Sequence, residues 1–78
     1  MSQVNFDYRS GILEAGDPDT DREWSWFKGD RWITETQHGE HRGVIEAPTG
    51  STVADIKRLI RARAKRAAAP WPGGNPMT

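Results

Sequence analysis

Residues 23–48 read EWSWFKGDRWITETQHGEHRGVIEAP, and this stretch decides the fold. Aromatic and β-branched residues flank Gly29-Asp30, a pattern that is typical of two strands joined by a two-residue turn. A second turn at His38-Gly39 adds a third strand. The stretch therefore predicts a three-stranded antiparallel meander.

The two turns also predict a register. Trp24 would face Glu35 across the first hairpin, and Glu35 would face Arg42 across the second. Because successive side chains of a strand point to opposite faces, this register sorts the large residues onto two faces. The expected core face receives Trp24, Trp26, Ile33 and Val44. The other face receives Phe27, Trp32 and Ile45. The N-terminal strand could cover them as further core; otherwise they form an uncovered aromatic patch, which is predicted to bind a protein partner or a second copy of the chain.

The N-terminal side of the meander is less regular. In residues 3–13 apolar side chains recur at a spacing of two, which predicts one strand. Residues 14–22, EAGDPDTDR, are acidic and contain an Asp-Pro pair, which favours a turn. We expect residues 14–22 to form a loop, so that the sheet has three or four strands.

The C-terminal side predicts one long helix. Thr52 is a good N-cap, and Asp55 three residues later completes a start that resembles a capping box. The helix begins at Val53 and ends before Pro70, which cannot continue it. Apolar residues at spacings of three and four predict one buried stripe. Its members are Val53, Ile56, Leu59, Ile60, Ala64 and Ala67.

These elements predict an α+β fold. A single small domain over residues 1–69 would hold a three- to four-stranded antiparallel β-meander, with the helix packed on one face. Residues 70–78, PWPGGNPMT, are rich in Pro and Gly and predict a flexible tail. The chain has 78 residues and no cysteine. Its core is therefore thin and has no disulfide, which fits a cytoplasmic protein. No apolar run reaches the length of a membrane span, and the N-terminus has no signal-peptide pattern.

Charge is distributed unevenly along the chain. Residues 1–50 contain five basic and ten acidic residues, and 5 − 10 = −5. Residues 51–78 contain six basic residues and one acid, which gives +5 and a formal net charge of zero for the whole chain. Such asymmetry indicates an electrostatic partner, unless the two halves neutralise each other within the fold.

The basic residues gather in residues 56–66, IKRLIRARAKR. Lys57, Arg61 and Lys65 follow one another at a spacing of four and therefore share one side of the helix, with Arg58 and Arg66 beside them. We predict that these five residues contact nucleic acid through its phosphates. Two other roles remain open: the last two cations could act on the helix dipole, and the acidic loop could pair with the helix.

No pattern for catalysis or cofactor binding is present. The chain has no cysteine, and no serine lies at a suggestive spacing from His38 or His41. The acidic run DPDTD (17–21) lacks the glycine and the terminal glutamate of an EF-hand loop, although alternating oxygen ligands could hold a cation. We expect a non-enzymatic protein with no cofactor and no metal.

The predicted order of three strands followed by a helix, with the hairpin GDRWITE, resembles the sheet-plus-helix modules of integrase arm-binding and AP2-type DNA-binding domains. That resemblance covers about residues 23–68 and implies DNA contact through the sheet. The strand–loop–helix passage VIEAPTGSTVADIKRLI is similar to part of β-grasp proteins. Neither resemblance is specific, and we assign the chain to no family.

Two functions follow from these patterns. The first is a small binding protein that contacts nucleic acid through the basic helix. The second is a protein–protein interaction module, such as a small regulator, an inhibitor or a virion component of a phage or mobile element. This module would use the aromatic sheet face to form a homodimer or to bind a protein partner.

Overall fold

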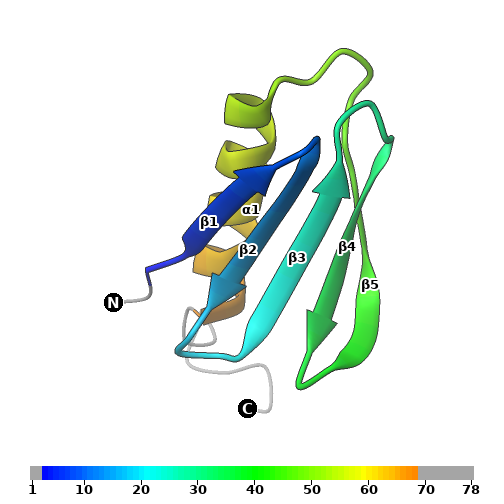
Figure 1. Ribbon diagram of the computed structural model, residues 1–78. Helices are drawn as coiled ribbons and strands as arrows, with labels where there is room; N and C mark the ends of the chain where they lie inside the picture. The colour runs from blue at the N-terminus through cyan, green and yellow to red at the C-terminus, as the bar shows by residue number, and fades with distance from the viewer. Residues whose placement is uncertain (1–2, 69–78) are drawn as a thin grey trace.

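The computed structural model describes residues 3–68, which form one antiparallel sheet and one helix (Figure 1). The strands pair in sequence order. Their bounds are β1 Asn5–Arg9, β2 Ile12–Asp17, β3 Arg22–Phe27, β4 Trp32–Gln37 and β5 Glu40–Glu46, and the helix is α1 Val53–Ala68. The α+β class and the antiparallel sheet are confirmed. The predicted tail over residues 70–78 lies outside the described residues.

The sheet has five strands, so the expected three or four was wrong. Residues 3–13 do not form a single strand, because Ser10 (φ 54°) and Gly11 (φ 80°) adopt left-handed conformations and turn the chain back. Two such residues in succession form the type I′ turn that suits the twist of a hairpin. The strand that follows, β2, occupies the region expected to be a loop.

The acidic region 14–22 forms strand because its side chains alternate between the two faces. Leu13, Ala15 and Asp17 are buried, whereas Glu14 is exposed. Ala, Gly and Asp are depleted in strands, so the strand propensity of this segment is low and β2 was not predicted. The segment forms a strand because it pairs with β1 on one side and with β3 on the other. Only residues 18–21 form a turn.

The first predicted hairpin register is confirmed where the ladder is continuous: Trp24 pairs with Glu35. The turn of this hairpin is not the expected two-residue turn at Gly29-Asp30. The amide of Asp30 donates to the carbonyl of Phe27 at 2.8 Å, and Gly29 has a φ of 95°. The ladder between β3 and β4 ends at Ser25 and Thr34, so the pairing does not continue up to the turn.

The second hairpin contains a bulge that shifts its register by one residue. The turn at His38-Gly39 is confirmed, with φ values of 54° and 80°. Beyond the pair Thr36–His41, however, Glu35 pairs with Gly43 and leaves Arg42 as the extra residue. A bulge of one residue moves every following side chain to the opposite face.

The shift corrects two predicted positions. Ile45 pairs with Ile33 and packs against the core, whereas Val44 is 52% exposed on the opposite face. Ile45 therefore does not lie on the same face as Phe27 and Trp32, and Val44 does not belong to the core. The sequence has no signal for a bulge at Arg42, and this is why the predicted faces differ beyond that point.

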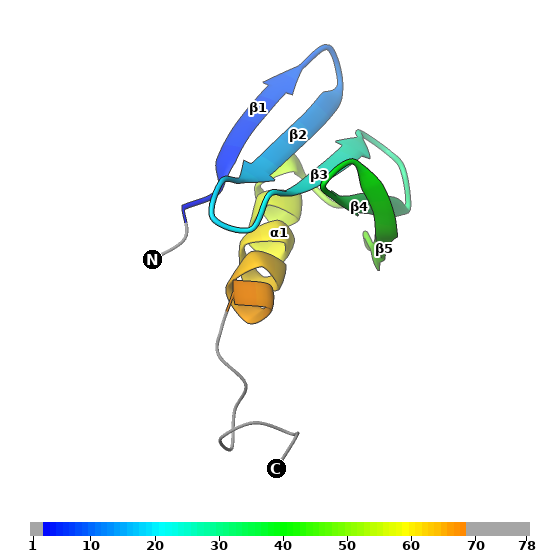
Figure 2. The same cartoon turned by 90° about the horizontal axis from the view of Figure 1, so that it is seen from below.

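The core lies between the sheet and α1. Trp24 and Trp26 are 2% and 1% exposed, as predicted for the core face. They pack with the helix stripe, of which Ile56, Ile60 and Ala64 are buried and Val53 and Leu59 are partly buried. The side chain of Ala67 lies outside the described residues. Figure 2 shows the twisted sheet with α1 beneath its middle strands and β5 set off to one side.

Candidate nucleic-acid interface

The basic helix begins with a reciprocal cap, as predicted. The amide of Asp55 donates to Thr52 Oγ1 at 3.1 Å, and the amide of Thr52 donates to Asp55 Oδ2 at 3.0 Å. These two bonds satisfy donors that a helix start otherwise leaves unpaired. The cap therefore fixes where α1 starts.

The surface of α1 that faces away from the sheet is basic. Ile56 and Ile60 direct the opposite surface into the core. Four of the five predicted nucleic-acid contacts are exposed, and the fifth, Lys57, is half-buried beside the sheet. The exposed residues of this outer helix surface are Ala54, Arg58, Arg61, Ala62, Lys65 and Arg66.

An aromatic ring on β1 supports two of these cations. Lys57 Nζ lies 5.5 Å from the centroid of the Phe6 ring, and Arg61 Cζ lies 4.9 Å from it. The ring face attracts a cation and leaves its N–H donors open to a further acceptor. Unlike a carboxylate, the ring does not cancel the positive charge. Phe6 thus positions Lys57 and Arg61 without neutralising them.

Few carboxylates reach the helix. Arg58 contacts Asp55 at 3.2 Å, an exposed pair one turn apart, and Arg63 contacts Glu35 at 2.9 Å. Within residues 3–68 no ion pair joins the acidic segment 14–23 to α1. Pairing of that segment with the helix, one of the open alternatives, is therefore not present in the structure.

Of the acids in the segment 14–23, Asp17 is buried on the helix side of the sheet, whereas Glu14 and Glu23 point away from the helix. Glu14 pairs with Ser25 and Glu23 pairs with Thr36, and all four lie on the sheet face opposite α1. Asp7 joins them there because it pairs with Glu14. These acids place negative charge on one face of the sheet, and α1 places positive charge on the other side. The uneven charge of the sequence therefore becomes a charge dipole in the folded domain.

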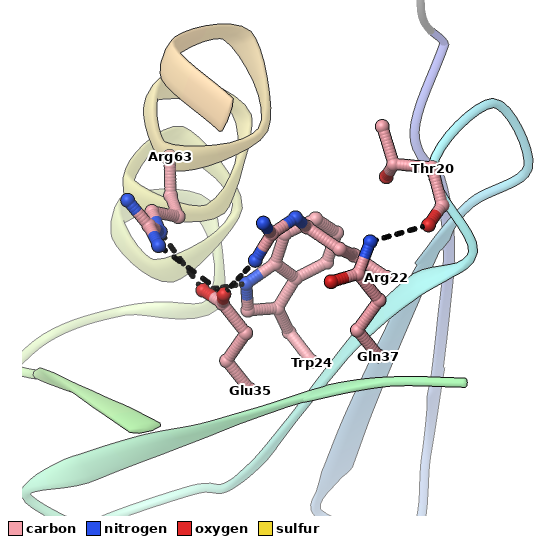
Figure 3. A network of polar contacts seen from close by, with 6 residues as sticks. All are labelled: Thr20, Arg22, Trp24, Glu35, Gln37 and Arg63. Atoms are coloured by element: carbon pink, nitrogen blue, oxygen red, sulfur yellow. Dashed lines mark hydrogen bonds and ion pairs between the residues drawn. The ribbon is translucent and has the colours of Figure 1, made fainter. Parts of the chain in front are cut away.

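A buried carboxylate links α1 to the sheet (Figure 3). Glu35 is 3% exposed and accepts hydrogen bonds from Arg22, from Trp24 Nε1 at 3.0 Å and from Arg63 Nε at 2.9 Å. The predicted cross-strand pair of Glu35 with Arg42 is wrong, because the bulge moves Arg42 out of register. Arg63 of α1 provides the contact to Glu35 instead.

The hydrogen bonds at Glu35 also determine its ionisation. Burial raises the pKa of Glu35, but the hydrogen bonds from Arg63 and Trp24 and the charges of Arg63 and Arg22 lower it by more. The pKa therefore lies below its ordinary value of 4.5, and the carboxylate is ionised at neutral pH. The partner shifts accordingly: the hydrogen bond from Glu35 raises the pKa of Arg63. This arrangement is a structural ion cluster and not a poised acid or base.

The structure separates Arg66 from the other predicted contacts. Arg66 lines a groove beside β5 together with Arg42 and Arg63, whereas Lys57 and Arg61 lie on the β1 side over Phe6. The helical spacing of the basic residues gives no sign that Arg42 lines this groove. Arg42 lies on β5, and its position there results from the bulge.

The predicted partner-binding residues do not form one patch. Phe27 and Trp32 are 56% and 49% exposed on the sheet face opposite α1, and Val44 shares that face. Ile45 lies on the helix side. The exposed apolar residues of the outer sheet face are therefore Phe27, Trp32 and Val44.

Other site types find little support in the described part of the chain. Within residues 3–68 no group of three or more His, Cys, Asp or Glu is placed to hold a metal ion. His38 Nδ1 contacts Asp21 Oδ2 at 2.8 Å, and both side chains are exposed. Over the same residues, no helix has the length and the apolar composition needed to cross a bilayer.

No protein family, no curated protein and no solved structure matches this chain. Its function is therefore inferred from the geometry and charge of the described residues.

Proposed function

We propose that the protein binds nucleic acid through the outer surface of α1. The observation that supports this best is the balance of charge there. Of Lys57, Arg58, Arg61, Lys65 and Arg66, only Arg58 has a carboxylate partner within residues 3–68. Lys57, Arg61 and Lys65 share one side of the helix without counter-charges, which favours a polyanion, since each phosphate contact releases condensed counterions.

The spacing of the cations also suits a phosphate backbone. Lys57, Arg61 and Lys65 lie along about 12 Å of the helix axis, at 1.5 Å per residue. Phe6 holds the first two in place, which reduces the side-chain entropy that binding would otherwise cost. The exposed alanines of this surface, Ala54 and Ala62, allow the helix backbone to approach a ligand closely.

The test is fluorescence anisotropy with labelled single- and double-stranded DNA and RNA at several salt concentrations. Arg61→Glu and Lys65→Glu, alone and combined, are expected to weaken binding strongly while the circular dichroism stays unchanged. Arg9→Glu is the matched control, because Arg9 is exposed on β1 and lies on the sheet face opposite α1. Binding by the double variant at wild-type strength and moderate salt would contradict the proposal.

A second candidate function is protein–protein interaction through the outer sheet face. The exposed side chains of Phe27, Trp32 and Val44 favour it, because exposed aromatic residues are enriched at interfaces. In this reading the protein forms a homodimer through the sheet or binds another protein. Sedimentation of the wild type and of Trp32→Ser distinguishes the readings: a monomer at all concentrations, unchanged by the substitution, speaks against self-association.

A further inference from the structure

A groove of about 430 Å³ runs between α1 and β5. It exists because α1 lies beneath the middle strands, so the helix leaves the β5 side of the same sheet face uncovered (Figure 2). Its walls combine cationic and apolar side chains. They include Arg42, Arg63, Arg66, Ile45, Leu59 and Ala62.

The groove has an excess of positive charge. Glu35 is the one acid among its lining residues, and it is almost fully buried against Arg22 and Arg63. Arg42 and Arg66 have no carboxylate partner within residues 3–68. Both are exposed, so their guanidinium groups are available to an acidic ligand.

One wall of the groove is the edge of the sheet. Within residues 3–68, β5 pairs with β4 alone, so its other side presents unpaired backbone groups. The bulge at Arg42 interrupts one end of the strand. Residues 43–46 are therefore the part of β5 that can pair with a further strand. Such a strand would lie beside the side chains of Ile45 and Leu59, which line the groove.

We propose that this groove binds an extended acidic segment of another protein. The segment adds to β5 as a sixth strand, its carboxylates meet Arg42 and Arg66, and its apolar side chains pack against Ile45 and Leu59. An open strand edge beside a helix is a recurring site for this mode of peptide binding. A nucleic acid could satisfy the arginines, but it has no peptide groups to complete the strand edge, which is why the observations favour a polypeptide.

The experiment uses the full chain and a labelled probe peptide with the repeat Thr-Glu-Thr-Val, called the Glu/Val peptide. In an extended strand this repeat places Glu and Val on the same face, where the arginines and the apolar side chains of the groove lie. Three comparisons define the mode: a Lys/Val peptide tests charge, a backbone N-methylated Glu/Val peptide tests strand addition, and an oligonucleotide tests the other class of ligand. Amide hydrogen exchange of residues 43–46 is followed with and without the Glu/Val peptide. The proposal predicts slower exchange at these amides and binding of the Glu/Val peptide alone among the peptides.

Two single substitutions separate this proposal from nucleic-acid binding by the outer helix surface. Arg42→Glu is expected to weaken peptide binding about tenfold and to leave oligonucleotide binding unchanged. Lys65→Glu is expected to do the reverse. Equal binding of the N-methylated or Lys/Val peptide, or no peptide binding, overturns the proposal. Loss of oligonucleotide binding in Arg42→Glu, with no effect on the peptide, would assign the groove to nucleic acid instead.

Discussion

Arg63 donates two hydrogen bonds to Glu35, at 2.9 and 3.3 Å, and so joins α1 to β4. The contact spans 28 residues of sequence and is one of the few polar links between helix and sheet in the described residues. With the buried stripe of Ile56, Ile60 and Ala64, it holds one side of the helix against the sheet. The basic residues of the outer helix surface therefore face away from the sheet.

Arg63→Ala should destabilise the domain. Glu35 keeps Arg22 and Trp24 as partners, so we expect a loss of about 1–3 kcal/mol, below the cost of leaving a buried charge fully unpaired. Urea unfolding measures it. The control is Arg61→Ala, which removes an arginine two residues away, on the outer helix surface, that has no carboxylate partner in residues 3–68. Equal losses for the two variants would contradict a specific role for the Glu35–Arg63 contact.

Acid should weaken the fold through Glu35. The pKa of Glu35 is lower in the folded state than its ordinary value of 4.5. A depressed folded pKa gives stability that is fully present above the unfolded pKa and is lost as the pH falls through the folded pKa. Thermal unfolding below about pH 4.5 should therefore lower Tm more steeply for the wild type than for Glu35→Gln. Parallel curves for the two proteins would show that this carboxylate does not contribute.

Loss of the helix cap should cost stability without changing the charge of the helix. Thr52→Ala removes the acceptor for the Asp55 amide, and an N-cap of this kind contributes about 1 kcal/mol. Thr49→Ala, in the exposed connector before the helix, is the control. Equilibrium unfolding gives the free energy of unfolding of both variants. Equal values for the two would mean that the cap does not contribute to stability.

Phe6→Leu tests the aromatic support of Lys57 and Arg61. Leu keeps an apolar side chain against the helix but removes the ring face, so the cations lose an attraction of about 0.5–1 kcal/mol. We expect oligonucleotide binding to weaken by a few-fold while its salt dependence stays the same, because no cation is lost. An altered salt slope would mean that the substitution changes the phosphate contacts themselves.

Much of the fold could be predicted because its signals are local. Thr52, Asp55 and the apolar stripe identify α1, and the His38-Gly39 turn identifies the second hairpin. What was missed depends on non-local pairing. Strand β2 contains Ala15, Gly16 and Asp17, which have little strand propensity of their own.

The candidate site, like the fold, could be predicted only in its local features. The basic side of the helix follows from spacing alone, so its residues were found. The environment of those residues was not, since Phe6 meets Arg61 through tertiary packing and Arg42 reaches the groove through a bulge. The extra residue in β5 also places Val44 and Ile45 on the faces opposite to those predicted. The alternation of polar and apolar residues in the sequence does not indicate this bulge.

We infer that the cations of the outer helix surface contact phosphates. The most direct test is the slope of the logarithm of the binding constant against the logarithm of the salt concentration, for the wild type and Lys65→Ala. Removing one phosphate contact should reduce the slope by about 0.7–0.9, depending on whether the strand is single or double. Arg9→Ala should leave it unchanged. Binding that is insensitive to salt, or a slope that Lys65→Ala does not alter, would contradict the claim.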